Sequence, residues 1–244
     1  MRLGIMQPYF FPYLGYYSLI KHTDSFVFLD TVQFIRHGWI ERNRILKPGD
    51  GWQYIAVPLE KHSRDTLIRD ITIRVGEQWQ EKIIRQIEHY KKRAPFYKDV
   101  TNLVAESISD KSTSIVQLNA RILSATCAYL DIPIRLSIFS EMQLTIETVN
   151  DAGEWALQIS KAVGAKEYVN PIGGVELFKP GQFRELGITL SFLSNSLSPY
   201  NQRRPTFEPG LSIIDVMMFN DPVAANKLID DVQVVSSNDI KNSK

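Results

Sequence analysis

The chain has little cysteine, no dominant charge and no long apolar run. Its single cysteine, Cys127, among 244 residues excludes a disulfide framework and favours a reducing compartment. Lys and Arg number 28 and Asp and Glu 27, a balance that argues against a nucleic-acid partner. No apolar stretch approaches the roughly 18 to 20 residues of a membrane-spanning helix. Pro8 and Pro12 interrupt the apolar residues at the start of the sequence, whereas a signal peptide has a continuous apolar segment. We therefore expect a soluble, cytoplasmic protein without a membrane span.

Common catalytic patterns are also missing. The four histidines, at positions 22, 37, 62 and 89, are too scattered for zinc-ligand spacing, so no metal site is expected. Neither a Walker phosphate loop nor a Gly-x-Ser-x-Gly elbow occurs, which removes the commonest ATPase and hydrolase classes.

The sequence does contain the alternation of strands and helices typical of α/β folds. Residues 2–6 and 26–30 read as buried strands that flank a helix over residues 14–21. This spacing fits a parallel crossover rather than a hairpin. Such a Rossmann-like βαβ unit places Gln7 and Asp30, which end the two strands, at one edge of the sheet, where open α/β sheets bind ligands.

The rest of the chain continues this pattern. Further strands are predicted over residues 52–57, 68–75, 134–139, 167–170 and 188–193, and helices over 77–92, 114–130, 151–163, 180–186 and 211–219. We expect a mostly parallel sheet with helices on both faces. One α/β domain would span residues 1–235, followed by a flexible tail over 236–244.

The loop after the first strand is the most distinctive segment. Residues 7–13, here called the signature loop, hold four aromatics and two prolines. Tyr9 and Tyr13 can stack on a sugar or a base, and prolines keep such a loop rigid. The alternative is a hydrophobic plug that closes the sheet edge. Gln7 favours a ligand site, because an amide at the end of a strand needs a partner.

A basic segment follows the second strand. Its candidate residues are Gln33, His37, Trp39, Arg42, Asn43 and Arg44. Arginine binds diphosphates and carboxylates through paired hydrogen bonds. A solvated basic loop without a ligand is an equally favoured interpretation of this segment. His37 is a candidate base, and Asp30 is the better-placed acid or base.

Two later loops add candidates. They are Asn170, Gly173, Gly174, Tyr200, Gln202 and Arg203. The paired glycines allow a close backbone approach to a ligand or a tight turn. The aromatic and basic cluster lies in a long loop of the kind that often serves as a lid.

Together these motifs resemble the WbqC-like family of bacterial proteins. The matching pieces cover nearly the whole chain: residues 6–16, Asp30 with 32–34, Trp39 with 42–45, Tyr90 with 94–95, Asn170 with 173–174, 200–202 with 207–209, and 211–215. Members resembling this chain are encoded with genes for O-antigen and other surface polysaccharides. The resemblance implies a transferase that attaches a glycyl or other acyl group to the amine of a nucleotide-linked amino sugar.

The hypothesis assigns roles to the candidate residues. Aromatic side chains would contact sugar or base, and one or more of Arg42, Arg44 and Arg203 would bind the diphosphate. Asp30 or His37 would take a proton from the sugar ammonium, because only the neutral amine attacks a carbonyl. Gln7 and Asn43 would orient the reacting groups. No cofactor is firmly implied; the candidate co-substrates are an acyl- or peptidyl-carrier thioester and ATP.

Two other functions stay open. The order of strand, proline-bearing loop, glycine and helix is loosely similar to HIGH-type adenylyltransferases, which predicts a nucleotidyltransferase-like enzyme that forms an adenylate. Tyrosines stand where those enzymes use histidines. The other function is non-catalytic binding of a sugar nucleotide in a glycan-assembly complex. The sugar, the donor and the oligomeric state are open.

Overall fold

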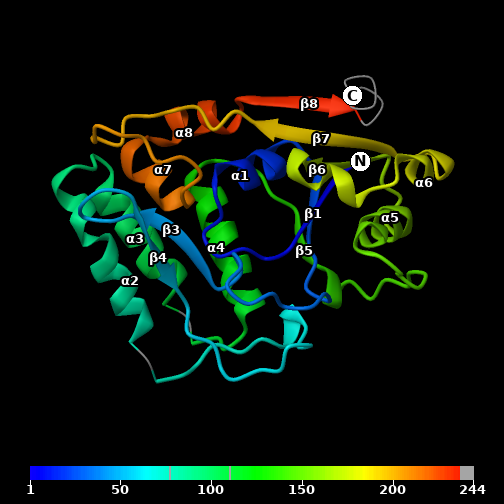
Figure 1. Ribbon diagram of the computed structural model, residues 1–244, viewed down its shortest axis with the longest axis horizontal. Coiled ribbons are helices and arrows are strands. Elements are labelled where there is room, and N and C mark those ends of the chain that lie inside the picture. The colour runs from blue at the N-terminus through cyan, green and yellow to red at the C-terminus, as the bar shows by residue number, and fades with distance from the viewer. Residues whose placement is uncertain (77, 110, 237–244) are drawn as a thin grey trace.

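The computed structural model describes residues 1–76, 78–109 and 111–236. At its centre lies a six-stranded sheet in the order β5-β2-β1-β6-β7-β8 (Figure 1). The strands are β1 (Arg2–Met6), β2 (Ser25–Phe28), β5 (Leu136–Ile138), β6 (Glu167–Pro171), β7 (Thr189–Asn195) and β8 (Val232–Ser236). All neighbours pair in parallel except β8, which is antiparallel to β7. The predicted mostly parallel α/β sheet is confirmed.

Helices cover both faces of this sheet. The larger core lies under α1 (Leu14–Lys21), α2 (Trp79–Ile87), α3 (Tyr97–Ser107), α4 (Ile115–Tyr129), α7 (Ile213–Phe219) and α8 (Pro222–Ile229). A smaller core on the opposite face lies under α5 (Ala152–Ala162) and α6 (Pro180–Glu185). Within the described ranges, no helix combines the length and the apolar character that crossing a membrane requires.

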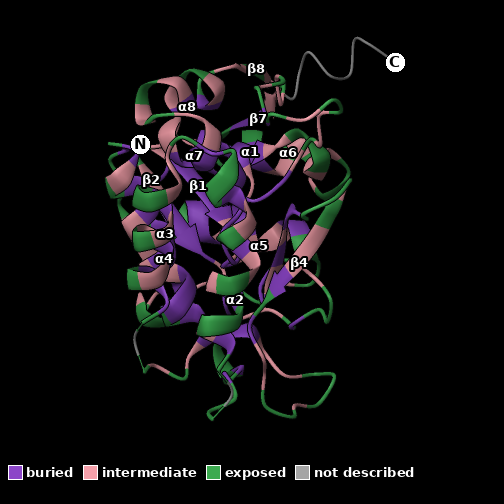
Figure 2. Ribbon diagram, turned by 90° about the vertical axis from the view of Figure 1, so that its left-hand side faces the viewer, coloured by how far each residue is buried: buried purple, intermediate pink, exposed green. Residues whose placement is uncertain are grey.

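The strands supply side chains to both cores because successive residues of a strand point to opposite faces. In β2, Phe26 and Phe28 enter the larger core and Val27 the smaller one. In β6, Val169 and Tyr168 divide in the same way. Figure 2 shows the buried residues concentrated along the central strands and the exposed ones on the outer helices. Such two-sided burial explains why these strands read as apolar runs in the sequence.

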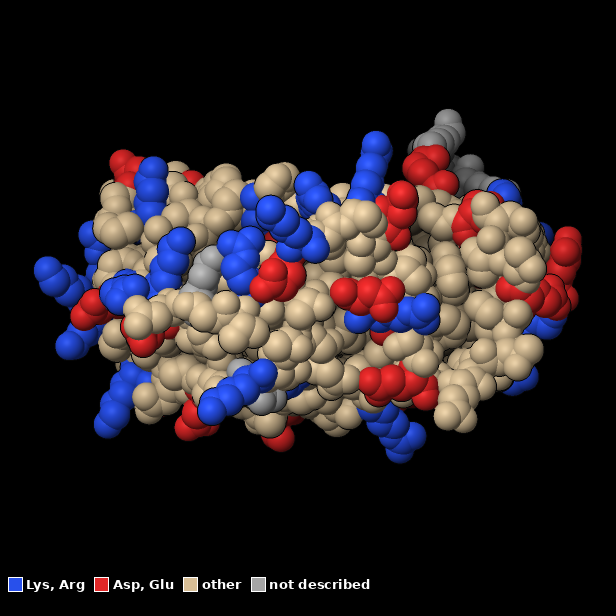
Figure 3. All heavy atoms as spheres, turned by 90° about the horizontal axis from the view of Figure 1, so that it is seen from below, with Lys and Arg blue, Asp and Glu red and all other residues tan. Residues whose placement is uncertain are grey.

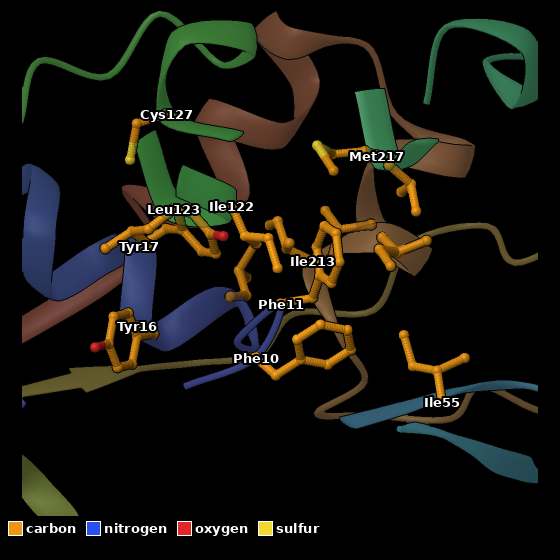
Figure 4. Close-up of a cluster of buried hydrophobic side chains, with 14 of the residues drawn as sticks. Phe10, Phe11, Tyr16, Tyr17, Ile55, Ile122, Leu123, Cys127, Ile213 and Met217 are labelled. Carbon is orange, nitrogen blue, oxygen red and sulfur yellow. The ribbon is translucent and has the colours of Figure 1, made fainter. Parts of the chain in front are cut away.

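A separate antiparallel hairpin, β3 (Arg42–Leu46) and β4 (Trp52–Ala56), packs beside this layer. The core beneath it includes Phe10 and Phe11 of the signature loop (Figure 4). Figure 4 shows these rings among side chains of three other elements: Ile55 of β4, Ile122 and Leu123 of α4, and Ile213 and Met217 of α7. The signature loop therefore buries Phe10 and Phe11 in the core, while Tyr9 and Tyr13 pack at its border and stay half-buried.

Some sequence predictions were wrong in detail. Residues 68–75 form no strand but a 3-10 turn, η1 (Ile68–Asp70), followed by isolated bridges. The apolar alternation there reflects burial of Ile71 and Ile73, while Val75 is 76% exposed. Four further elements were not predicted from the sequence: β3, α3, α8 and β8.

Other boundaries fall close to the predictions. The predicted helix over 77–92 is α2 followed by a 3-10 turn, η2 (Glu88–Lys92), and residue 77 lies outside the described residues. Two further 3-10 turns are η3 (Phe139–Glu141) and η4 (Ile172–Leu177). Of the predicted tail, Ser236 ends β8, and residues 237–244 lie outside the described residues.

Candidate functional site

The strand order reverses between β1 and β6. From β1 the chain moves outward to β2 and β5, and it then returns to β6, β7 and β8 on the other side of β1. The carboxyl ends of β1 and β6 therefore border the topological switch point, the usual ligand site of open α/β sheets. Gln7 follows the first of these strands, and Asn170 and Pro171 end the second.

Two adjoining cavities lie at this switch point and share Met6, Tyr9 and Pro171. The arginine chamber, of about 400 Å³, is further lined by Tyr13, Trp39, Asn43, Arg44, Leu197 and Gly210. The neutral chamber, of about 500 Å³, is lined by residues that include Gln7, Gln33, Trp155, Asn170, Gly173 and Gly174. Together they are called the cleft, and its volume suits a small-molecule ligand.

The cleft brings together many of the predicted site residues. The cleft is lined by the predicted residues of the signature loop and the Asn170 turn and by Gln33, Trp39, Asn43 and Arg44. Six other predicted residues do not line it: Asp30, His37, Arg42, Tyr200, Gln202 and Arg203. Lining residues that were not among the predicted site residues include Trp155, Tyr168, Phe178, Leu197 and Gly210. Trp155 lies on the helix predicted over residues 151–163.

Buried asparagines hold the signature loop in place. The side-chain amide of Asn43 donates to the carbonyls of Phe10 and Phe11 at 3.0 and 2.9 Å, and its oxygen accepts the Arg44 N–H at 2.8 Å. Asn119, on α4, donates to the carbonyl of Pro8 at 2.8 Å. The Asn43 amide is thus fully engaged with backbone.

Hydroxyl groups complete this support. The Tyr16 hydroxyl donates to the Gln7 carbonyl at 2.7 Å, and the Ser212 hydroxyl donates to the Phe11 carbonyl at 2.8 Å. Phe11 has a φ of 39°, in the left-handed region, a strained conformation that surrounding contacts must maintain. The loop is therefore a preorganised wall of the cleft.

Of the described residues that line the cleft, Arg44 is the one that carries a charge. Its guanidinium lies 5.4 Å from the ring centroid of Trp39 and 5.1 Å from that of Trp52. Nη2 donates to the Gly210 carbonyl at 3.1 Å, whereas Nε is buried without a partner. No carboxylate in the described part of the chain pairs with it. An uncompensated guanidinium in a cavity favours an anionic ligand.

Two polar groups of the signature loop remain free. Among the described residues, neither the Gln7 side-chain amide nor the Tyr9 hydroxyl has a hydrogen-bond partner, and both side chains are half-buried. Burial raises the pKa of Tyr9, and the neighbouring Tyr13 raises it further. The Tyr9 phenol therefore stays protonated and available as a donor at neutral pH.

The two predicted proton acceptors lie elsewhere. Asp30 is 1% exposed, and its carboxylate accepts the Ser140 N–H at 3.0 Å and the Ser140 hydroxyl at 2.5 Å. His37 is exposed with a φ of 61°. Its carbonyl accepts from Arg42, whose guanidinium lies 4.0 Å from the Tyr54 ring centroid.

The loop over residues 196–212 is tied to a buried carboxylate. Asp215, fully buried, accepts hydrogen bonds from Tyr90 at 2.6 Å, Tyr200 at 2.5 Å and Gln202 at 2.9 Å. Burial raises the pKa of Asp215 to about 6. Arg203, the third predicted residue of this loop, is exposed with a φ of 52°.

Neither a thiol nor a metal cluster adds to the site. Cys127 is fully buried, and burial raises its pKa to about 12, so it packs as a small hydrophobe. Within the described ranges, no group of three or more His, Cys, Asp or Glu side chains is arranged to hold a metal ion.

Comparison with known proteins yields a family and one relative. The model of the WbqC-like protein family matches residues 7–227. An uncharacterised protein of Mycobacterium tuberculosis, Rv1507c, is 29% identical over 222 residues, which cover 90% of this chain and 93% of that protein. No solved structure matches the chain.

Proposed function

The chain belongs to the WbqC-like protein family, and we propose that its cleft binds a nucleotide-linked amino sugar and that the protein attaches an acyl or aminoacyl group to the sugar amine. The observation that carries this proposal is Arg44, an unpaired guanidinium between Trp39 and Trp52 in an otherwise neutral cleft. A diphosphate supplies the opposite charge that this guanidinium lacks and acceptor oxygens beyond the Gly210 carbonyl.

The surroundings of Arg44 support an anionic ligand with aromatic or sugar groups. Figure 3 shows more basic than acidic side chains over the end of the molecule that carries α2 and the β3–β4 hairpin. Such a surface attracts anions from solution. Inside the chamber, the rings of Tyr9, Tyr13 and Trp39 offer faces for stacking on a base or a sugar ring.

The neutral chamber suits an uncharged, polar group. The free amide of Gln7 can donate to a hydroxyl or a carbonyl and accept from a hydroxyl or an amide. The Asn170 side chain is already engaged: it donates to the Pro171 carbonyl at 2.9 Å and accepts from Tyr168 at 2.8 Å. Gln33 donates to the Arg64 carbonyl at 2.8 Å. Gln7 is therefore the predicted amide of the neutral chamber whose side chain makes no hydrogen bond within the described part of the chain.

The proposed acyl transfer requires the protein to orient the two substrates, and it requires no nucleophilic side chain. A neutral sugar amine attacks an activated acyl carbon directly, and none of the described residues that line the cleft is a Ser, Thr, Cys or Lys. Holding two groups in reacting geometry supplies much of such a rate enhancement. The roles of Asp30 and His37 in deprotonation stay predictions, and a water path would have to link either group to the amine.

Non-catalytic binding is the second candidate. It is favoured by one observation: among the described residues, no Asp, Glu, His, Lys or Cys lines the cleft, so tyrosines are its acid–base groups. It predicts that a sugar nucleotide binds and is never modified. Adenylate formation, the remaining alternative, predicts ATP–pyrophosphate exchange that depends on an amino acid.

Mass spectrometry distinguishes these candidates. The protein is incubated with a dTDP-linked 4-amino-4,6-dideoxyhexose and, in turn, with glycyl or acetyl carrier-protein thioesters and with ATP plus glycine. A product that gains the acyl mass supports the transferase. Binding of dTDP without any product favours the second candidate, and absence of both binding and product contradicts the proposal.

A further inference from the structure

The cleft has two parts of different chemistry that meet at one point. The arginine chamber carries the charge, and the neutral chamber carries none. They meet at Met6, Tyr9 and Pro171, next to the carboxyl ends of β1 and β6. A site for one compact ligand needs no such division, whereas a group transfer needs two substrates whose reacting atoms come together.

We propose that the chambers hold the two substrates of one transfer, with Tyr9 donating a hydrogen bond to the acyl oxygen where they meet. The diphosphate of the acceptor lies on Arg44, and its amino sugar extends to the junction. An uncharged thioester donor occupies the neutral chamber and brings its acyl carbon to the same point. This inference rests on the proposed function and adds the arrangement of substrates and a catalytic residue.

Tyr9 is suited to this role by position and by its free hydroxyl. It borders both chambers, and its hydroxyl has no hydrogen-bond partner in the described part of the chain. Its ring lies 5.5 Å from that of Tyr16. The carbonyls on either side, of Pro8 and Phe10, are held by Asn119 and Asn43. A donor fixed in this way requires little reorganisation when negative charge develops on the acyl oxygen.

The neutral chamber fits a thioester arm better than a second phosphate. Its apolar lining includes Val32, Trp155, Leu177 and Phe178. Within the part of the chain that the structure describes, no Lys or Arg lines it to balance a phosphate charge. The amide of Gln7 offers hydrogen bonds of the kind that the amides of a pantetheine arm can complete.

The proposed step balances without a covalent intermediate on the protein. The nitrogen lone pair of the neutral amine attacks the acyl carbon, a C–N bond forms, and the carbonyl π electrons move to the oxygen that Tyr9 contacts. When this intermediate collapses, the C–S bond breaks and sulfur leaves with the electron pair as a thiolate. The proton lost by nitrogen passes to the thiolate or to water, and Tyr9 keeps its own proton.

The first test asks whether two ligands bind together. The probes are dTDP for the arginine chamber and acetyl-pantetheine for the neutral chamber, titrated by calorimetry against the full chain. Simultaneous binding, with saturating dTDP changing the Kd of acetyl-pantetheine less than threefold, is the expected result. Mutually exclusive binding would overturn the proposal. Failure of the wild-type protein to bind dTDP contradicts instead the proposed function.

The second test concerns Tyr9 itself. Tyr9→Phe keeps the ring and removes a hydroxyl that bonds to nothing in the described residues, so the fold and the Kd of dTDP should not change. In the acyl-transfer assay, kcat should fall on the order of a hundredfold, the usual loss for one oxyanion donor, while KM stays within threefold. Tyr97→Phe, on α3, is the matched control. An unchanged kcat for Tyr9→Phe refutes its catalytic role.

Discussion

Asn43→Ala is expected to destabilise the protein by about 3 to 5 kcal/mol, because one buried side chain supports three backbone groups. Asn43 is 3% exposed, and it bonds to Phe10, Phe11 and Arg44 at 2.8 to 3.0 Å. Its loss removes the support that joins β3 to the wall of the cleft.

The magnitude follows from what alanine leaves behind. The carbonyl of Phe10 and the N–H of Arg44 lose the Asn43 side chain as their partner, at a cost of about 1 to 3 kcal/mol each if they remain buried and unpaired. The Phe11 carbonyl keeps the Ser212 hydroxyl at 2.8 Å, so it loses only about 0.5 to 1.5 kcal/mol. These costs do not add fully, since the groups belong to one network.

Asn43→Asp tests the direction of the hydrogen bonds. The carboxylate has the same shape and still accepts from Arg44, but it places an anion against two carbonyl oxygens. Only its protonated form can donate, so its pKa in the folded state rises above the ordinary value of about 3.9. The free energy of unfolding of the Asn43→Asp variant is therefore expected to be greatest below a pH of about 3.9 and to fall as pH rises through the folded pKa of the introduced carboxyl group.

Urea unfolding measured by tryptophan fluorescence reads both variants, because Trp39 and Trp52 flank Arg44. The control is Asn102→Ala, at an exposed position on α3, which should change stability by less than about 0.5 kcal/mol. A loss below about 1 kcal/mol for Asn43→Ala would show that the wall does not depend on this side chain.

Three further predictions follow from other parts of the structure. Arg44→Gln should weaken dTDP binding at least tenfold in calorimetry and Arg44→Lys should restore it only in part, because lysine lacks the planar fork of arginine; equal affinity of all three proteins contradicts the anion site. Asp215 has a folded pKa of about 6 against 3.8 for the free group, so its contribution is full below pH 3.8 and lost as pH rises through 6, about 3 kcal/mol in all. The stability of the wild type relative to Asp215→Asn should decline over that interval in urea unfolding, and a flat difference counts against the raised pKa. In Gly174→Ala the new Cβ would lie 2.2 Å from Asn170 Nδ2, whereas in Gly173→Ala it meets nothing within 4 Å, so the first should cost about 1 to 3 kcal/mol in thermal unfolding and the second far less.

The first βαβ unit could be read from the sequence because both of its strands are buried on two faces. Continuous apolar runs and a crossover-length gap leave few other arrangements. The structure pairs Met6 with Phe28 in parallel register, which places the ends of both strands on one edge. The strand beyond, β5, and the position of β6 on the other side of β1 depend on long-range packing that no local pattern contains.

β3 was missed because polar residues occupy both of its faces. Asn43 points inward, where apolar side chains are usual, since it bonds to the backbone of a loop more than 30 residues earlier. The run from Arg42 to Arg44 therefore looked like a basic loop. Strand register also decides which arginine lines the cleft, and without β3 the sequence offered no reason to prefer Arg44.

Partners distant in sequence account for the rest of the candidate site. Asp30 seemed free at the end of β2, but Ser140, which bonds to it, follows β5 and lies 110 residues away. Tyr200 and Gln202 looked like a lid, yet both bond to Asp215. Polar residues can be recognised from sequence, whereas the partners that engage them depend on tertiary structure.

The support of the signature loop also has a consequence for biosynthesis. The loop leaves the ribosome before the side chains that bond to its carbonyls, which come from Asn43, Asn119 and Ser212. A nascent chain that ends before Ser212 lacks at least one of them and keeps the apolar rings of Phe10 and Phe11 without their complete core. Because such long-range contacts form late, the rings of Phe10 and Phe11 stay exposed to aggregation until the Ser212 segment has been made.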